Sequence, residues 1–325
     1  MSTADTRRTP GLVPVSETRE STERTPPLTA TGPVAATGSA AEASGGVGRG
    51  WAFGRMARSE LGLTFRRPRN LAMLAVLAMV PVLIGVVVRL IGAEDADGGP
   101  GGAGGLVAQT AGNGLMLTFA ALFVLVPLLL PVAVSVVAGD SIAGEASAGT
   151  LRYLLAAPAG RTRLLVVKYA NAVVFCLAAT GVVALAALVT GLVLFPTGPV
   201  TLLSGTTVSF AEGLLRSLIV VGYVTAGMAA LAAVALALST FTEVPIGAIA
   251  STVVLVIVTQ VLSAIPQLEV IKPYLLPTYW TGFDGVLRDP VAVGDLTQGL
   301  LAFGAYVLLF GSIAWARFTG RDITA

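Results

Sequence analysis

The chain has 325 residues, of which 55% are hydrophobic and only 12% are charged, and its formal net charge is +2. Soluble domains carry about 25% charged residues, so a soluble enzyme could not cover its surface with so few charges. The composition therefore indicates an integral membrane protein. Because the sequence has no histidine and a single cysteine, Cys176, it excludes the usual zinc sites, histidine-based triads and disulfide frameworks.

Residues 1–50 are predicted to form a disordered cytoplasmic tail. They contain no Phe, Trp, Tyr or Ile, and five acidic residues balance five arginines. Such a segment has too little apolar surface to form a core. It also lacks the apolar run of a secretory signal peptide, so we expect it to stay attached on the side where the chain is made.

Residues 51–69 are expected to form an amphipathic helix that lies on the membrane surface. Apolar side chains recur at helical spacing while arginines fall on the opposite side: Phe53, Met56, Ala57, Leu61 and Phe65 against Arg55, Arg58 and Arg66. This pattern is typical of an interfacial helix. A basic stop signal next to the membrane, with no such helix, is the alternative.

Six apolar stretches approach the ~20 residues that a helix needs to cross ~30 Å of hydrocarbon. They are Leu71–Ile91, Leu115–Gly139, Leu165–Phe195, Leu214–Ser239, Ile246–Ile265 and Gly299–Ala316. None contains Asp or Glu. Since only helices satisfy every backbone group within a single lipid-embedded segment, the predicted fold class is an all-α bundle of six transmembrane helices.

The basic residues predict the orientation of the chain. Ten lie before the first span, four between the second and third and two after the sixth, so sixteen of the twenty share one side. The opposite loops hold only Lys272 and Arg288, and Arg89 and Arg216 are expected to snorkel from span ends. The positive-inside rule then makes both termini cytoplasmic. Abundant Ala, Gly, Val and Arg suggest a GC-rich bacterial genome, and the expected location is the bacterial plasma membrane.

Polar and aromatic residues in the second half of the chain have expected roles. In the outer loop, residues 266–298, the side chains of Tyr274, Tyr279 and Trp280 are interpreted as an interfacial aromatic belt. Within the spans, Asn171 and Gln260 are expected to make hydrogen bonds between helices rather than to bind a substrate.

The most informative segment is the loop between the second and third spans, residues 140–163. Thr150 can cap a short helix whose Leu151, Leu154 and Leu155 share one face, and Pro158 then ends it. This loop offers nothing to bury that apolar face. A membrane surface or a partner protein would have to cover it.

The spacing Glu-x-x-x-Gly-Thr-Leu, then Leu-Leu-x-x-Pro-x-x-Arg and a lysine entering the next span, resembles the permeases of ABC-2 type exporters. The matching residues are Glu145, Gly149, Thr150, Leu151, Leu154, Leu155, Pro158, Arg161 and Lys168. The resemblance covers residues 51–325, which it implies form one six-helix transmembrane domain with short outer helices. It further implies that the loop docks on an ATPase subunit, with Glu145 and Arg152 as polar contacts. Asp140 is expected instead to pair with Arg161 or Lys168 inside the loop.

The chain cannot supply the ATPase itself. Its two lysines, Lys168 and Lys272, follow Val167 and Ile271, so neither belongs to a Gly-Lys-Ser/Thr phosphate-binding loop. The resemblance therefore implies a transporter subunit that is not an enzyme, with a separate ATPase that uses ATP and Mg and a second permease chain, identical or different. Membrane lipid is an expected partner and nucleic acid is not. An ion-gradient-driven secondary transporter and a non-transporting membrane anchor or assembly factor remain as alternatives.

Overall fold

The computed structural model describes residues 47–91, 110, 112–149, 160–202 and 204–320, with side chains described from Gly54 to Leu90 in the first of these ranges. Residues 1–46 of the predicted tail lie outside the described residues. The first helix begins at Val47, four residues earlier than expected. Residues 46–325 form one compact unit.

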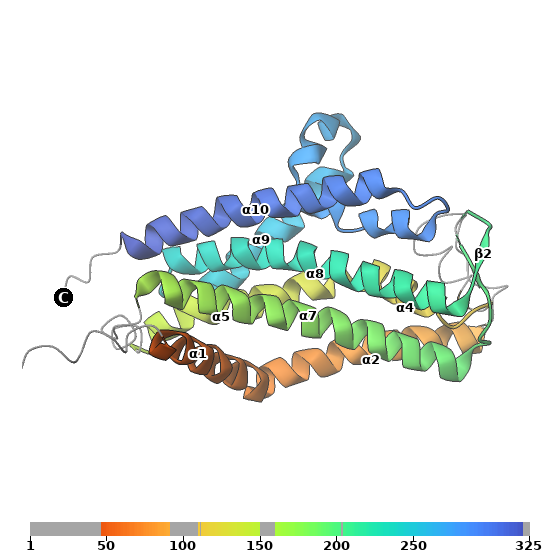
Figure 1. Ribbon diagram of the computed structural model, residues 1–325. Coiled ribbons are helices and arrows are strands. Elements are labelled where there is room, and N and C mark those ends of the chain that lie inside the picture. Colours follow the sequence, from red (N-terminus) through yellow and green to blue (C-terminus); the bar gives the residue numbers. More distant parts are fainter. Residues whose placement is uncertain (1–46, 92–109, 111, 150–159, 203, 321–325) are drawn as a thin grey trace, which may run out of the picture. The chain divides into compact units, whose positions relative to one another are not determined.

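Six long apolar helices dominate this unit and confirm an all-α membrane protein in outline (Figure 1). They are α2 (Pro68–Ile91), α5 (Leu129–Ser147), α7 (Arg161–Leu194), α8 (Phe210–Phe241), α9 (Pro245–Ala264) and α10 (Val293–Thr319). Each is long and apolar enough to cross a membrane. With 34 residues, α7 extends ~51 Å and exceeds the hydrocarbon layer by ~20 Å.

The second predicted span is not one continuous helix, which corrects the expectation for Leu115–Gly139. It consists of α4 (Met116–Leu125) and α5, separated by a turn at Val126–Leu128. Pro127 lies in this turn. Because proline has no backbone N–H group, it cannot donate a helical hydrogen bond. The side-chain amide of Gln260 on α9 donates to the Pro127 carbonyl at 2.5 Å, which satisfies an oxygen freed by the break. The expectation that Gln260 links helices is confirmed.

Helix α8 lies at the centre of the bundle and contacts α5, α7, α9 and α10. Its buried middle is rich in alanine, which allows close helix packing. Ser239 ties α8 to α5: its hydroxyl donates to the Gly139 carbonyl at 2.7 Å and accepts from the backbone amides of Ile142 and Ala143.

The backbone of Gly114, just before α4, lies against that of Gly191 near the end of α7. A Cβ atom built on either glycine would overlap the carbonyl oxygen of the other. Beside this crossing, Asn113 donates from its side chain to the Gly198 carbonyl at 3.0 Å. The chain then forms a two-residue antiparallel ribbon, β1 (Val200–Thr201) with β2 (Thr207–Val208), which the all-α prediction misses.

Between α9 and α10 the chain forms three short 3-10 helices, η1 (Pro266–Tyr274), η2 (Leu276–Tyr279) and η3 (Gly282–Leu287). Trp280 is fully buried here, so it is not part of an aromatic belt. Arg216 does not snorkel either: it is buried and donates to the Val286 and Arg288 carbonyls and to Glu212. Both corrections have one cause: Trp280 and Arg216 hold the segment between α9 and α10 against α8.

Helix α1 (Val47–Arg66) precedes the first span and meets α2 at an elbow around Arg67 (Figure 1). Its amphipathic character is as predicted, since Arg58 and Arg66 are exposed while Phe65 packs against Phe175 of α7. The elbow follows from Pro68, because proline favours the first turn of a helix and disfavours helical backbone in the preceding residue.

Candidate functional site

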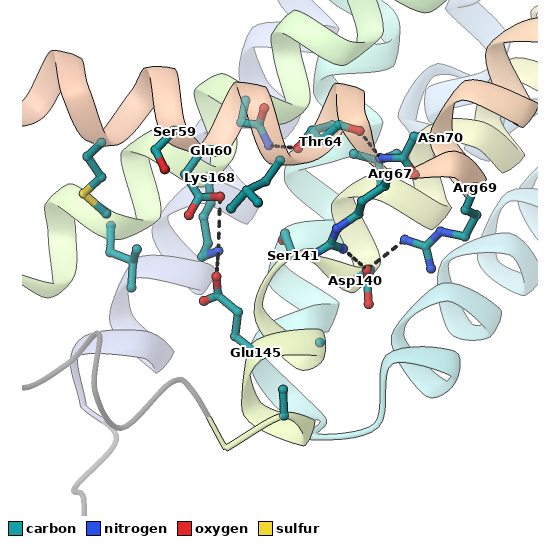
Figure 2. A pocket seen from close by; sticks show the side chains of 17 residues that line it. Ser59, Glu60, Thr64, Arg67, Arg69, Asn70, Asp140, Ser141, Glu145 and Lys168 are labelled. Carbon is teal, nitrogen blue, oxygen red and sulfur yellow. Dashed lines mark hydrogen bonds and ion pairs between the residues drawn. The ribbon is translucent and has the colours of Figure 1, made fainter.

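A polar cavity of about 740 Å³ lies between α1, the last turns of α5 and the first turns of α7 (Figure 2). One stripe of α1 lines it at helical spacing, from Met56 through Glu60 to Thr64, and Arg67 follows at the elbow. Opposite stand Asp140 and Glu145 of α5 and Lys168 of α7. The cavity therefore brings together six charged side chains from four segments of the chain.

At one end of the cavity two guanidinium groups converge on a single carboxylate. Arg67 and Arg69 each donate to Oδ2 of Asp140 at 2.8 Å. Asp140 is largely buried, whereas both arginine side chains are about half exposed. The expected pairing of Asp140 with Arg161 or Lys168 is wrong, because α5 continues as a helix past residue 140 and turns this carboxylate toward the elbow.

At the other end of the cavity one ammonium group lies between two carboxylates. Lys168, 3% exposed, donates to Glu145 at 2.5 Å, and Oε2 of Glu60 lies 3.8 Å from the same nitrogen. Burying a lysine is costly unless it is paired, and these carboxylates supply the pairing. Glu145 thus contacts a neighbouring span, which the interpretation of Glu145 as an ATPase contact did not include.

Between the two charged groups lie three buried polar side chains. Asn171 of α7 donates to the Thr64 hydroxyl at 2.7 Å, and Asn70 of α2 donates to the Thr64 carbonyl at 2.8 Å. The predicted role of Asn171 in linking helices is confirmed. The Oδ1 atoms of Asn70 and Asn171 are buried and have no hydrogen-bond partner among the described residues.

The residues predicted to dock on an ATPase divide into two groups. Glu145 belongs to α5, Gly149 follows that helix with a φ of +69°, and Arg161 opens α7 and donates to the Thr319 carbonyl at 2.9 Å. The others lie outside the described residues: Thr150, Leu151, Arg152, Leu154, Leu155 and Pro158. Because α5 extends to Ser147, the connection between α5 and α7 is shorter than the expected loop at 140–163.

Sequence reasoning missed Glu60, Arg67 and Arg69 as members of this site. Glu60 and Arg67 stand seven residues apart, which places them on one face of a helix two turns apart. That spacing was visible, but their partners are 71 to 108 positions away along the chain, and only the packing of α1 brings them together. Among the described residues, no group of His, Cys, Asp and Glu side chains could hold a metal ion.

Six helices that are long and apolar enough to cross a membrane indicate a multi-pass, all-α membrane protein. Residues 105–324 match the family described as a protein of unknown function, DUF2705, and the chain belongs to that family. The match runs from just before α4 to the end of α10. A comparison with curated proteins finds no match.

Proposed function

We propose that the chain is the transmembrane permease subunit of an ATP-driven ABC exporter of the ABC-2 type. In this proposal both termini are cytoplasmic, α1 lies in the membrane surface, and residues 148–160 dock on a separate ATPase subunit. Closure of two ATPase subunits would pull on this segment and tilt α5 and α7. A second permease chain would complete the translocation path in a bacterial plasma membrane.

The observation that carries the proposal is the position of the docking motif relative to the helices. Glu145 and Gly149 stand at the end of α5, and Arg161 stands at the start of α7. The same end of the unit holds α1, through the Glu60 and Lys168 contact, and the end of α10, through the Arg161 and Thr319 contact. An even number of crossings, with α1 and the end of α10 on the motif's side, is the layout that the ABC-2 resemblance implies.

The structure also supplies a rigid base for such a docking segment. On one side of it, α5 is held to α7 by Lys168, to the elbow by Asp140 and to α8 by Ser239. On the other side, Trp315 of α10 donates to the Thr162 hydroxyl at 3.0 Å. A force on the segment would therefore reach four spans at once.

The binding test uses a stand-alone ATPase encoded by a gene next to that of this chain. A photoreactive residue at Leu151 or Leu154 should cross-link to this ATPase in membranes, and the same residue at Ser204, at the opposite end of the bundle, should not. The adduct would be identified by peptides that contain the ATPase's phosphate-binding loop. Equal cross-linking at Ser204, or none at either loop position, would contradict the proposal.

One observation favours the alternative of a secondary transporter. Lys168 and its two carboxylates form a buried titratable cluster, and such groups within spans often mark ion pathways. However, Lys168 stands only seven residues after the start of α7, ~10 Å along a helix of ~51 Å. A cluster at the end of a span suits a mechanical joint better than a proton relay, so we prefer the permease.

A further inference from the structure

We propose that the outward face of α1 binds the headgroups of anionic phospholipids, with phosphatidylglycerol as the representative ligand. The binding surface, which we call the arginine stripe, consists of Arg55, Arg58, Gly62 and Arg66. The inference does not depend on the proposed function, since α1 can bind lipid whether or not an ATPase docks on residues 148–160.

The apolar side of α1 is largely used inside the unit. Phe65 packs against Phe175 of α7, with 6.3 Å between the ring centroids. Met56 packs against a cluster that α5, α7, α8 and α10 form together, and Thr64 is buried and accepts a hydrogen bond from Asn171. The side that α1 presents to its surroundings is therefore mainly its polar one.

Three exposed arginines share this outward side. From the pitch of an α-helix, Arg55, Arg58 and Arg66 lie within ~80° of one another around the axis, with Gly62 between them. Among the described residues, none of the three arginines has a hydrogen-bond or ion-pair partner. The acidic residue of α1, Glu60, points the other way, toward α7. The arginine stripe therefore carries three positive charges and no negative charge on the same face.

A shallow hollow of about 580 Å³ lies over the middle of the arginine stripe. Gly62 leaves this space open, because a Cβ atom built there would meet nothing within 4 Å. Arg58 and Arg66 stand one helical turn away on either side and line the same hollow. Their flexible side chains can both reach a phosphate placed over Gly62, and arginine binds phosphate with paired hydrogen bonds. Ser59 adds an exposed hydroxyl group to the lining.

The position and the apolar lining favour a lipid over a soluble anion. Arg66 stands two residues before the first span, where headgroups meet hydrocarbon. Leu61, Leu63 and Phe65 also line the hollow, and Leu63 is 56% exposed. The acyl chains of a lipid would cover these apolar groups, whereas inorganic phosphate or a nucleic acid would leave them in water. The positive charge selects anionic headgroups over zwitterionic ones, whose ammonium groups the arginines repel.

The test is a lipid titration of the purified full-length chain in detergent, measured by native mass spectrometry. The parent should bind dioleoyl phosphatidylglycerol about tenfold more tightly than the corresponding phosphatidylcholine. The triple variant Arg55→Gln, Arg58→Gln and Arg66→Gln should lose most of this preference and bind phosphatidylcholine like the parent. Because the three side chains are exposed and unpaired, melting in detergent should show that the variant folds.

A second pair of variants tests the hollow itself. Gly62→Glu places a carboxylate one helical turn from both Arg58 and Arg66, so it should pair with them and weaken phosphatidylglycerol binding by about tenfold. Gly62→Gln adds a side chain of the same size without the charge, and its affinity should stay within about threefold of the parent. The open space around Gly62 admits either side chain without a clash.

The matched control for net charge is Arg7→Gln, Arg8→Gln and Arg19→Gln, which removes three arginines from the N-terminal tail. This control should bind phosphatidylglycerol like the parent, and soluble glycerol phosphate should compete only weakly. The proposal is overturned if the parent shows no preference, if the stripe variant keeps it or the tail control loses it equally, if Gly62→Glu and Gly62→Gln bind alike, or if glycerol phosphate competes as well as the lipid.

Discussion

Lys168 of α7 donates a hydrogen bond to Glu145 of α5 at 2.5 Å, across 23 positions of sequence. Glu145 stands two residues before the end of α5, and Lys168 stands seven residues after the start of α7. The pair therefore closes the base of the connection that we propose as the ATPase contact. Any movement of that connection has to break this pair or carry both helices with it.

Replacing Lys168 by methionine should destabilise the protein. The substitution keeps a side chain of similar length but leaves the largely buried carboxylates of Glu145 and Glu60 without their common partner. Removing one member of a buried ion pair costs about 3–5 kcal/mol, and the partial exposure of both glutamates favours the lower figure. Thermal melting in detergent measures the loss.

The double variant Lys168→Met with Glu145→Gln should recover part of that stability, because it removes the orphaned charge. If the single and double variants melt at the same temperature as the parent, the ion pair contributes nothing and the described base of the connection is incorrect.

The Gly114 and Gly191 crossing should tolerate no side chain. Gly191→Ala places a methyl group where the Gly114 carbonyl oxygen lies, and the resulting overpacking should cost about 1–3 kcal/mol or more. Gly181→Ala on the same helix is the matched control, since its Cβ would meet open space, and it should be neutral or stabilising by up to about 1 kcal/mol. Equal melting temperatures for the two variants would show that α4 and α7 do not cross at these glycines.

Ser239→Ala should weaken the joint between α5 and α8. The change removes the hydroxyl that bonds Gly139, Ile142 and Ala143 in a fully buried place, at a cost of about 1–3 kcal/mol. Ser312→Ala, whose exposed hydroxyl bonds only the Leu308 carbonyl of its own helix, should stay within about 0.5 kcal/mol. A melting temperature for Ser239→Ala as high as that of the control would contradict the described joint.

The sequence predicted the spans well because long apolar runs are a strong signal that depends only on local composition. It did not predict the break at Pro127, because proline inside a membrane helix is often tolerated. Nor could it predict the approach of Gly114 to Gly191, since 77 positions separate the two and small residues occur throughout the spans. The roles of Asn171 and Gln260 were predictable, because an amide within a span needs a partner on another helix.

The charged residues near the end of α5 were harder to interpret. Asp140 and Glu145 follow the apolar run that ends at Gly139, so the sequence predicts a loop there, yet α5 continues through both. A charge reversal at Glu145 would place a second cation beside Lys168, so it would disturb packing as well as any docking. Arg152 and Leu154 are further positions at which to test docking, since the resemblance places both in the docking segment.

The orientation of the chain can be tested by cysteine labelling in a Cys176→Ala background. A cysteine at Ser204 should react with an impermeant thiol reagent added to intact cells, and cysteines at Ser147 and Gly320 should react only after the membrane is opened. All three residues are exposed, so access depends on sidedness rather than burial. Labelling of Ser147 from outside would reverse the orientation and remove the basis for cytoplasmic docking.

The most direct test of the permease assignment is the ATP hydrolysis rate of the neighbouring ATPase, purified alone and together with this chain in lipid. We expect the parent chain to raise that rate and Leu154→Asp to abolish the increase, because a charge on the apolar face would prevent docking. Leu28→Asp, the same substitution in the N-terminal tail, should behave like the parent. A hydrolysis rate that is the same with the parent chain, with Leu154→Asp and with no permease at all would contradict the account.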